Sequence, residues 1–260
     1  MRDIAKMIRR LWLIGMLLLQ LAWAAPCPAQ AREFLDGLQD YHRGDFQQAV
    51  LKWEALSTAG LVNGKLYYNL GNAFLKGNDL GRALLWYERA LTLIPSDPDL
   101  NFNYDYARSL TQDAQEERLS AWVRIVFFWK YQLSPRTIRL LALGLNLVFW
   151  ALFLTWRLTR RRALRRAAWV AGLATLVFIL TAAFQYMEGA QRRLGVILPE
   201  QVAVRSGLEP TSTELFKLHA GARVRVARTH KEHYQIRFSD DKIGWVPQGV
   251  VGLIATAEPK

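Results

Sequence analysis

Few side chains in this chain are suited to catalysis or to metal binding. Cys27 is the only cysteine, which excludes an intrachain disulfide and a multi-cysteine metal site. His230 and His233 suggest a metal-binding pair, but no third ligand accompanies them, and they fall between two strand-like runs where an exposed hairpin tip is expected. The histidines and carboxylates form no recognisable acid–base, nucleophile or metal constellation. The residues therefore predict no enzyme activity, no cofactor and no bound metal.

The positive charge of the chain is concentrated in its most apolar segment. The 260 residues carry 34 Lys and Arg against 22 Asp and Glu, a net charge of +12. A basic balance can indicate nucleic-acid binding, but residues 119–187 alone hold ten basic side chains and no acidic one. Basic residues bordering apolar stretches are typical of membrane proteins. We therefore expect a membrane partner and no nucleic-acid partner.

Two apolar stretches predict transmembrane helices at 138–156 and 167–187. Each holds a charge-free run that approaches the ~20 residues needed to cross a ~30 Å hydrocarbon core. Aromatic residues near their ends, such as Trp156 and Tyr186, suit the headgroup region. The alternative is a buried helix pair of a soluble protein, although such helices normally keep a polar face.

The loop at 157–166, between the two stretches, is rich in arginine. Short Lys/Arg-rich loops remain in the cytoplasm, so both flanking regions are expected outside it. Membrane topology explains these residues, and DNA or lipid recognition is the alternative. The arginines are Arg157, Arg160, Arg161, Arg162, Arg165 and Arg166.

The N-terminal residues 1–31 predict a secretory signal. A basic start, an apolar run and small residues follow one another, with cleavage favoured after Ala31. Cleavage after Ala24 or retention as an anchor is the alternative. Before the first apolar stretch, residues 119–137 mix aromatics such as Trp122 and Phe127 with cations, which indicates either a helix in the membrane interface or a last helix of the preceding domain.

Residues 32–118 contain a repeat of 34 residues, the tetratricopeptide period. Its small residues let paired helices approach closely, its aromatics fill the space between turns, and a proline ends the second helix. A further helix after the repeats is predicted to cap the stack. The repeat-defining residues are Ala49, Trp53, Leu70, Gly71, Phe74, Ala83, Tyr87, Ala90 and Pro95.

The concave face of such a stack is the candidate peptide groove. Aromatics with an amide and a cation suit an extended or helical peptide, although several of them are equally suited to packing on the capping helix. The groove residues are Phe34, Leu38, Tyr41, Lys65, Tyr68, Asn72, Leu75, Phe102 and Tyr106.

After a short polar linker at 187–194, residues 195–257 change to period-two alternation, which predicts a small antiparallel barrel. Short sequence motifs such as Val202-Ala-Val-Arg-Ser-Gly207 and Gly244-Trp-Val246 resemble those of the bacterial SH3 family. That resemblance implies binding of peptides or cell-wall glycopeptide, although the aromatics equally suit the barrel core and rim. The residues singled out are Val204, Arg205, Gly221, Tyr234, Gly244 and Trp245.

The predicted fold class is a multi-domain membrane protein: all-α tetratricopeptide hairpins, a two-helix transmembrane hairpin and a small all-β SH3-like barrel. This order of parts resembles the aerotolerance-operon tetratricopeptide proteins, the E-type members of the Bat family. The resemblance implies action beside von Willebrand A-domain membrane proteins and a MoxR-type ATPase in envelope maintenance.

Two functions follow as hypotheses. The first is a non-enzymatic scaffold of the bacterial inner membrane, with both folded modules on the periplasmic side for protein–protein interaction. The second is an envelope anchor that binds peptidoglycan through the SH3-like domain. Fold resemblance alone does not decide between them.

Overall fold

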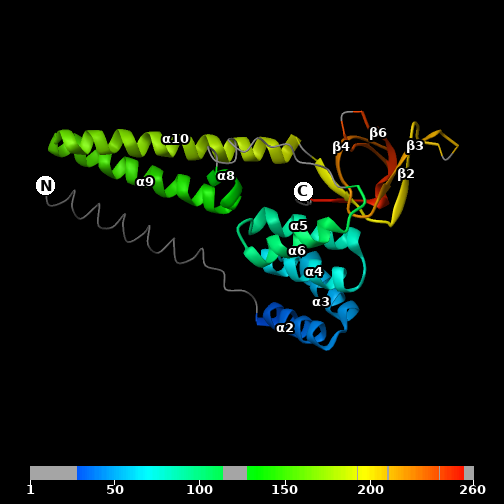
Figure 1. The fold of residues 1–260 in the computed structure, drawn as a ribbon. Coiled ribbons are helices and arrows are strands. Elements are labelled where there is room, and N and C mark those ends of the chain that lie inside the picture. The colour runs from blue at the N-terminus through cyan, green and yellow to red at the C-terminus, as the bar shows by residue number, and fades with distance from the viewer. Residues whose placement is uncertain (1–27, 114–127, 192, 210, 240, 255–260) are drawn as a thin grey trace.

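The computed structural model describes residues 28–113, 128–191, 193–209, 211–239 and 241–254 (Figure 1). Within these residues, a group of helices is followed by two long apolar helices and then by antiparallel strands. This agrees with the predicted mixture of helical and β parts. The predicted signal up to residue 27 and the aromatic residues Trp122 and Phe127 lie outside the described residues.

Five helices form the first part of the structure, and the first four make two hairpins. The turns of the hairpins are equivalent: Gly44 and Asn78, which are 34 residues apart, both adopt left-handed backbone with φ of 87° and 62°. Glycine and asparagine tolerate this conformation best. The helices are α2 (Pro28–Arg43), α3 (Phe46–Thr58), α4 (Gly64–Lys76), α5 (Leu80–Leu93) and α6 (Pro98–Ser109).

The two hairpins share the same internal contact. A Cβ atom on Gly37 would lie 2.5 Å from the Trp53 ring, and one on Gly71 would lie 2.4 Å from the Tyr87 ring. The absence of a side chain on one helix therefore makes room for an aromatic ring on the next. The other repeat-defining residues that are buried are Ala49, Leu70, Phe74, Ala83 and Ala90, and Pro95 follows the end of α5.

Two long helices, α9 (Pro135–Thr159) and α10 (Arg162–Gln191), run side by side and extend away from the other elements (Figure 1). Both are long and apolar enough to cross a membrane, with mean hydropathies of 1.9 and 2.1 in their most apolar windows. Most of their apolar side chains are exposed to the surroundings, in contrast to a core helix of a soluble protein. Both helices are longer than the predicted stretches.

The connections around these helices are shorter than predicted. The loop expected at 157–166 narrows to two residues, Arg160 and Arg161, because arginine is a good helix former and both helices continue through the basic segment. The linker expected at 187–194 is largely the end of α10. Before α9, the short helix α8 (Phe128–Gln132) contacts α10 where Trp129 Nε1 donates a hydrogen bond to Thr181 Oγ1 at 3.3 Å.

Seven strands form one antiparallel sheet in the order β3-β2-β6-β5-β4-β1-β7. Its inner face is a cluster of buried aliphatic residues such as Ile197, Val204, Ile236 and Val246. The strands are β1 (Arg193–Ile197), β2 (Gln201–Arg205), β3 (Glu214–His219), β4 (Arg223–His230), β5 (His233–Arg237), β6 (Ile243–Pro247) and β7 (Val251–Leu253). Figure 1 shows the sheet strongly curled.

The sheet docks on the helices through α5. Val196 of β1 and Ile254, which follows β7, belong to the buried apolar cluster of the helices. Arg89 of α5 donates to the main-chain carbonyl of Leu253, with Nη2 at 2.9 Å. The helices and the sheet therefore share a core, although more than 80 residues separate α6 from β1 in the chain.

Candidate functional site

The polar residues predicted to line a groove form a hydrogen-bonded network between α4 and α6. Asn72 Oδ1 accepts hydrogen bonds from the Tyr87 hydroxyl at 2.6 Å and from Asn103 Nδ2 at 2.9 Å. Asn103 Nδ2 also donates to the Tyr68 hydroxyl oxygen at 2.9 Å. Burial raises the pKa of the Tyr87 hydroxyl, which remains protonated and able to donate. Helix α6 therefore covers the middle of the predicted groove.

Lys65 also contacts these elements, at the start of α6. Its Nζ lies 2.5 Å from Asp97 Oδ2 and 5.4 Å from the centroid of the Tyr68 ring. The hydrogen bond from Lys65 lowers the pKa of the Asp97 carboxyl, and the same bond raises the pKa of the Lys65 ammonium. Lys65, Tyr68 and Asn72 thus pack on the capping helix, which was the alternative that the sequence left open.

The groove residues of α2 surround Trp53. The Phe34 carbonyl accepts a hydrogen bond from Trp53 Nε1 at 3.1 Å, and the centroids of the Tyr41 and Trp53 rings are 6.0 Å apart. Burial raises the pKa of the Tyr41 hydroxyl, and the neighbouring Tyr68 adds to this effect. Phe34, Tyr41, Leu38 and Leu75 are all half-buried against the helical core.

Three exposed apolar side chains line up on one face of α6 and on the residue that follows it. Phe102, Tyr106 and Leu110 follow at intervals of four residues and are 75%, 55% and 48% exposed. We call these three residues the α6 stripe. The predicted groove includes Phe102 and Tyr106 but not Leu110, although the interval of four in the sequence indicates it. Large apolar side chains gathered on one exposed helix face are typical of protein-binding surfaces.

A second surface lies on the outer face of the sheet. Arg205, Trp245, Gln235 and Arg228 stand opposite one another on β2, β6, β5 and β4, and we call them the arginine–tryptophan row. The row is held in place at one end, where Arg205 Nη1 donates to the Ser212 carbonyl at 2.8 Å. The row combines an aromatic ring, an amide and two guanidinium groups, which together suit an anionic or sugar-containing ligand.

Two more arginines lie beside this row. Arg225 of β4 and Arg237 of β5 are direct cross-strand partners, and both are exposed. Like charges directly opposite each other destabilise a sheet, and neither guanidinium forms an ion pair with a carboxylate among the described residues. The β4–β5 part of this outer face is therefore electropositive, whereas Glu214 of β3 stands opposite Arg205 at the other end of the row. Period-two alternation in the sequence indicates that Arg225 and Arg237 face outward, but of these sheet arginines only Arg205 was predicted as a site residue.

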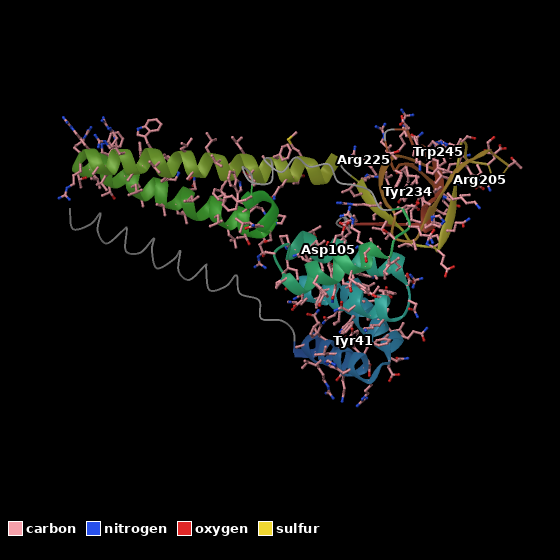
Figure 2. The ribbon with its side chains drawn as sticks, viewed as in Figure 1. Tyr41, Asp105, Arg205, Arg225, Tyr234 and Trp245 are labelled. Atoms are coloured by element: carbon pink, nitrogen blue, oxygen red, sulfur yellow. The ribbon has the colours of Figure 1, made fainter. Side chains whose placement is uncertain are left out.

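The remaining sheet residues from the sequence analysis are structural. Val204 and Gly244 are buried, and Tyr234 is half-buried against the sheet core. Gly221 lies against α5, since a Cβ atom there would be 2.5 Å from Leu84. Figure 2 shows Tyr41 on α2 well apart from Trp245 on the sheet, so the groove residue Tyr41 and the arginine–tryptophan row are separate.

An open cavity of about 780 Å³ lies where the α4–α5 turn meets the sheet. Its lining includes Asn78, Arg82, Glu200 and His219. Asp113 holds His219 there, because its carboxylate accepts from the His219 backbone N–H at 2.6 Å and lies 3.0 Å from the ring Nδ1. Within the lining, Arg82 Nε lies 3.3 Å from Asp79 Oδ2.

The loop arginines and the histidine pair lie at exposed turns. Arg157, Arg160, Arg161, Arg162, Arg165 and Arg166 are all exposed at the turn between α9 and α10. His230 and His233 are partners at the tip of the β4–β5 hairpin. In the described part of the chain, no three His, Cys, Asp or Glu side chains form a group that could hold a metal ion.

Comparison with known proteins adds no relative. No family model matches this chain. No curated protein matches it either.

Proposed function

We propose that this protein is a non-enzymatic scaffold of the bacterial inner membrane that presents its helices and its sheet on the periplasmic side for protein–protein interaction. In this proposal α2–α6 are tetratricopeptide hairpins with a capping helix, and the sheet is an SH3-like barrel. The resemblance to the E-type Bat proteins favours an envelope stress or aerotolerance complex, with von Willebrand A-domain membrane proteins as partners.

One observation carries the proposal: the six loop arginines and the folded parts of the chain lie at opposite ends of the α9–α10 pair. The six loop arginines occupy the turn between the helices, and α2–α6 and the sheet lie at the other end (Figure 1). The positive-inside rule assigns the arginine turn to the cytoplasm. Both folded parts then lie on the opposite side, and their shared core supports a location in the same compartment.

The α6 stripe supports the binding half of the proposal. Its three apolar side chains are exposed on one face, whereas the polar groove residues of α4 are already bonded to α6. A partner helix or extended segment with apolar side chains at matching intervals would bury this stripe. We therefore assign the partner surface to Phe102 and Tyr106 in preference to Tyr68 and Asn72.

The topology can be tested with reporter fusions to the full chain. Alkaline phosphatase fused after Ile254 is expected to be active, and green fluorescent protein inserted between Arg160 and Arg161 is expected to fluoresce. The opposite pattern would contradict the assignment of compartments. Extraction of the protein from membranes by alkaline carbonate would contradict an integral membrane protein.

The partner surface can be tested by photo-crosslinking in cells. Probes replacing Phe102 and Tyr106 are expected to capture a von Willebrand A-domain membrane protein, identified by mass spectrometry. A probe at Leu51, an exposed residue of α3, is the matched control and is expected to capture none. Equal capture from all three positions would argue against a specific surface.

The alternative is a peptidoglycan-binding anchor, which the arginine–tryptophan row favours. An aromatic ring beside guanidinium groups suits sugar rings that carry carboxylates. Co-sedimentation of the detergent-solubilised full chain with purified cell wall tests this function. Quantitative co-sedimentation that is lost in Trp245→Ala would favour the anchor over the scaffold, and absence of co-sedimentation would favour the scaffold.

A further inference from the structure

Helix α9 carries a carboxamide near the middle of its length. Asn146 is the twelfth of the 25 residues of α9, which measures about 37 Å at 1.5 Å per residue. If α9 crosses a ~30 Å hydrocarbon core, as the proposed function requires, Asn146 lies close to the midplane. A polar group at that depth has no water to bond with, and leaving it without a partner costs free energy.

The described part of the chain gives this carboxamide no hydrogen-bond partner. Asn146 is half-buried on the flank of the α9–α10 contact. On α10, the only buried hydroxyl in the described spans is that of Thr175, and it donates to the carbonyl of Ala171 within its own helix at 2.8 Å. The neighbouring contact between Phe149 and Gly172 is apolar. The Nδ2 donor and the Oδ1 acceptor of Asn146 are therefore both available to a partner that lies beside the hairpin.

A second N–H group lies one turn further along the same flank. Trp150 is 50% exposed, and its ring packs between Phe149 and Phe153 with centroid distances of 5.2 Å and 5.7 Å. No hydrogen bond from its indole N–H is present among the described residues. Tryptophan prefers the headgroup region of a membrane, so an exposed indole near the midplane indicates a surface covered by protein. Asn146 and Trp150 thus mark one uncovered face of α9.

We propose that a second copy of this chain covers this face, with the two α9 helices crossing at Asn146. A carboxamide contains both a donor and an acceptor, so two copies related by a two-fold axis satisfy each other: Nδ2 of each Asn146 donates to Oδ1 of the other. Both copies have the same orientation in the membrane, which places the two residues at the same depth. Interhelical amide bonds of this kind hold transmembrane helices together. Trp150 then packs beside the amide pair and shields it from lipid.

The inference rests on the proposed membrane insertion, and its test separates the two. The full chain is reconstituted in phosphatidylcholine vesicles in a Cys27→Ala background, and single cysteines are oxidised with copper phenanthroline. Leu143→Cys, three residues from Asn146 on the same face, is expected to give a disulfide-linked dimer. Val148→Cys is exposed on the opposite side of α9 and is the matched control, expected to give none.

The amide is then removed in the Leu143→Cys background. Asn146→Leu is expected to raise the protein-to-lipid ratio required for half-maximal crosslinking about tenfold. Thr155→Val is expected to leave the ratio unchanged, because the Thr155 hydroxyl already donates to the carbonyl of Ala151 at 2.7 Å.

The following outcomes would overturn the inference. Equal crosslinking at positions 143 and 148, or an Asn146→Leu variant that behaves like the parent, would exclude the amide contact. A crosslinked product whose mass differs from that of two chains would exclude a second copy as the occupant. Protein that is integral to the vesicles yet monomeric would overturn this inference alone, whereas protein released by carbonate would overturn the proposed function as well.

Discussion

A Cβ atom on Gly81 would lie 2.2 Å from the carbonyl oxygen of Leu198. Helix α5 and the β1–β2 connection therefore touch through their backbones, with no side chain between them. The equivalent residue of the first hairpin, 34 positions earlier, is Gln47, and it is exposed. The two copies differ at this position because only the second one meets the sheet.

We expect Gly81→Ala to destabilise the docking of the sheet on α5. The added methyl group meets backbone atoms of Leu198 and Ile197, which cannot rotate away, so the expected loss is about 1–3 kcal/mol. Gly249→Ala is the matched control, since nothing lies within 4 Å of a Cβ atom there. Thermal unfolding of the full chain in detergent measures the stability of both variants. Equal melting temperatures for the two variants would contradict the backbone contact.

We expect Glu88→Leu to destabilise the same interface. Glu88 is buried between α5, α6 and the sheet, where its Oε1 accepts from the Tyr104 hydroxyl at 2.7 Å and lies 3.4 Å from Arg223 Nε. Burial and the adjacent carboxylate raise the pKa of the Tyr104 hydroxyl, so it remains a donor. Loss of a charged acceptor for these groups is expected to cost about 1.5–3 kcal/mol in the free energy of unfolding.

The repeat provides the control for this change. Glu54 occupies the equivalent position of the first hairpin, where no sheet docks, and burial raises the pKa of its carboxyl. Glu54→Leu is therefore expected to change the unfolding temperature much less than Glu88→Leu. A larger effect at Glu54 would show that the position matters for the helices themselves and not for docking.

We expect the contribution of Asp97 to depend on pH. Its pKa is lowered by the hydrogen bond from Lys65, so the stabilisation is present above the ordinary value of 3.8 and is lost as the pH falls through the lower, folded-state value. The pKa of Lys65 is raised, so the stabilisation that its charge contributes is lost only as the pH rises above the ordinary value of 10.5. Asp97→Asn keeps an acceptor for the Leu100 N–H but removes the charge.

The comparison of parent and Asp97→Asn by thermal unfolding tests this dependence. The difference is expected to be about 0.2–1 kcal/mol at neutral pH, because Lys65 is largely exposed, and to vanish in strong acid. Asp97→Ala also removes the helix cap and is expected to lose about 1 kcal/mol more. A difference that grows as the pH falls would contradict the ion pair.

We expect Arg225→Glu to stabilise the sheet. Arg225 and Arg237 are direct cross-strand partners of like charge, and the change creates a pair of opposite charge. The expected gain is about 0.2–1 kcal/mol, measured by thermal unfolding at low salt. Arg193→Glu, at the exposed start of β1 opposite Val226, is the control and is expected to give no comparable gain. If the arginines bind an anionic ligand, the more stable variant is expected to bind it less well.

Several elements of the fold have a local signal in the sequence, but the contacts between the elements do not. Gly44 and Asn78 mark equivalent turns, and the apolar stretches predicted α9 and α10, because such features depend on neighbouring residues in the chain. The groove residues were equally suited to binding a peptide and to packing on the capping helix, and Asn103 on α6 bonds to Tyr68 and Asn72, which is the second of these. Nothing local in the sequence indicates which polar side chains of α4 and α6 meet.

The sequence by itself determined the repeat, the apolar helices, the arginine turn and the alternation of the strands, since each is a periodicity or a composition within a short segment. Only the tertiary structure decided that the sheet docks on α5, that Glu88 meets Arg223 and that Arg89 bonds to the Leu253 carbonyl 164 residues away. Such contacts depend on how complementary surfaces meet in space. A glycine at position 81 can occur in any helix. Its lack of a side chain matters here only because another stretch of backbone is packed against it.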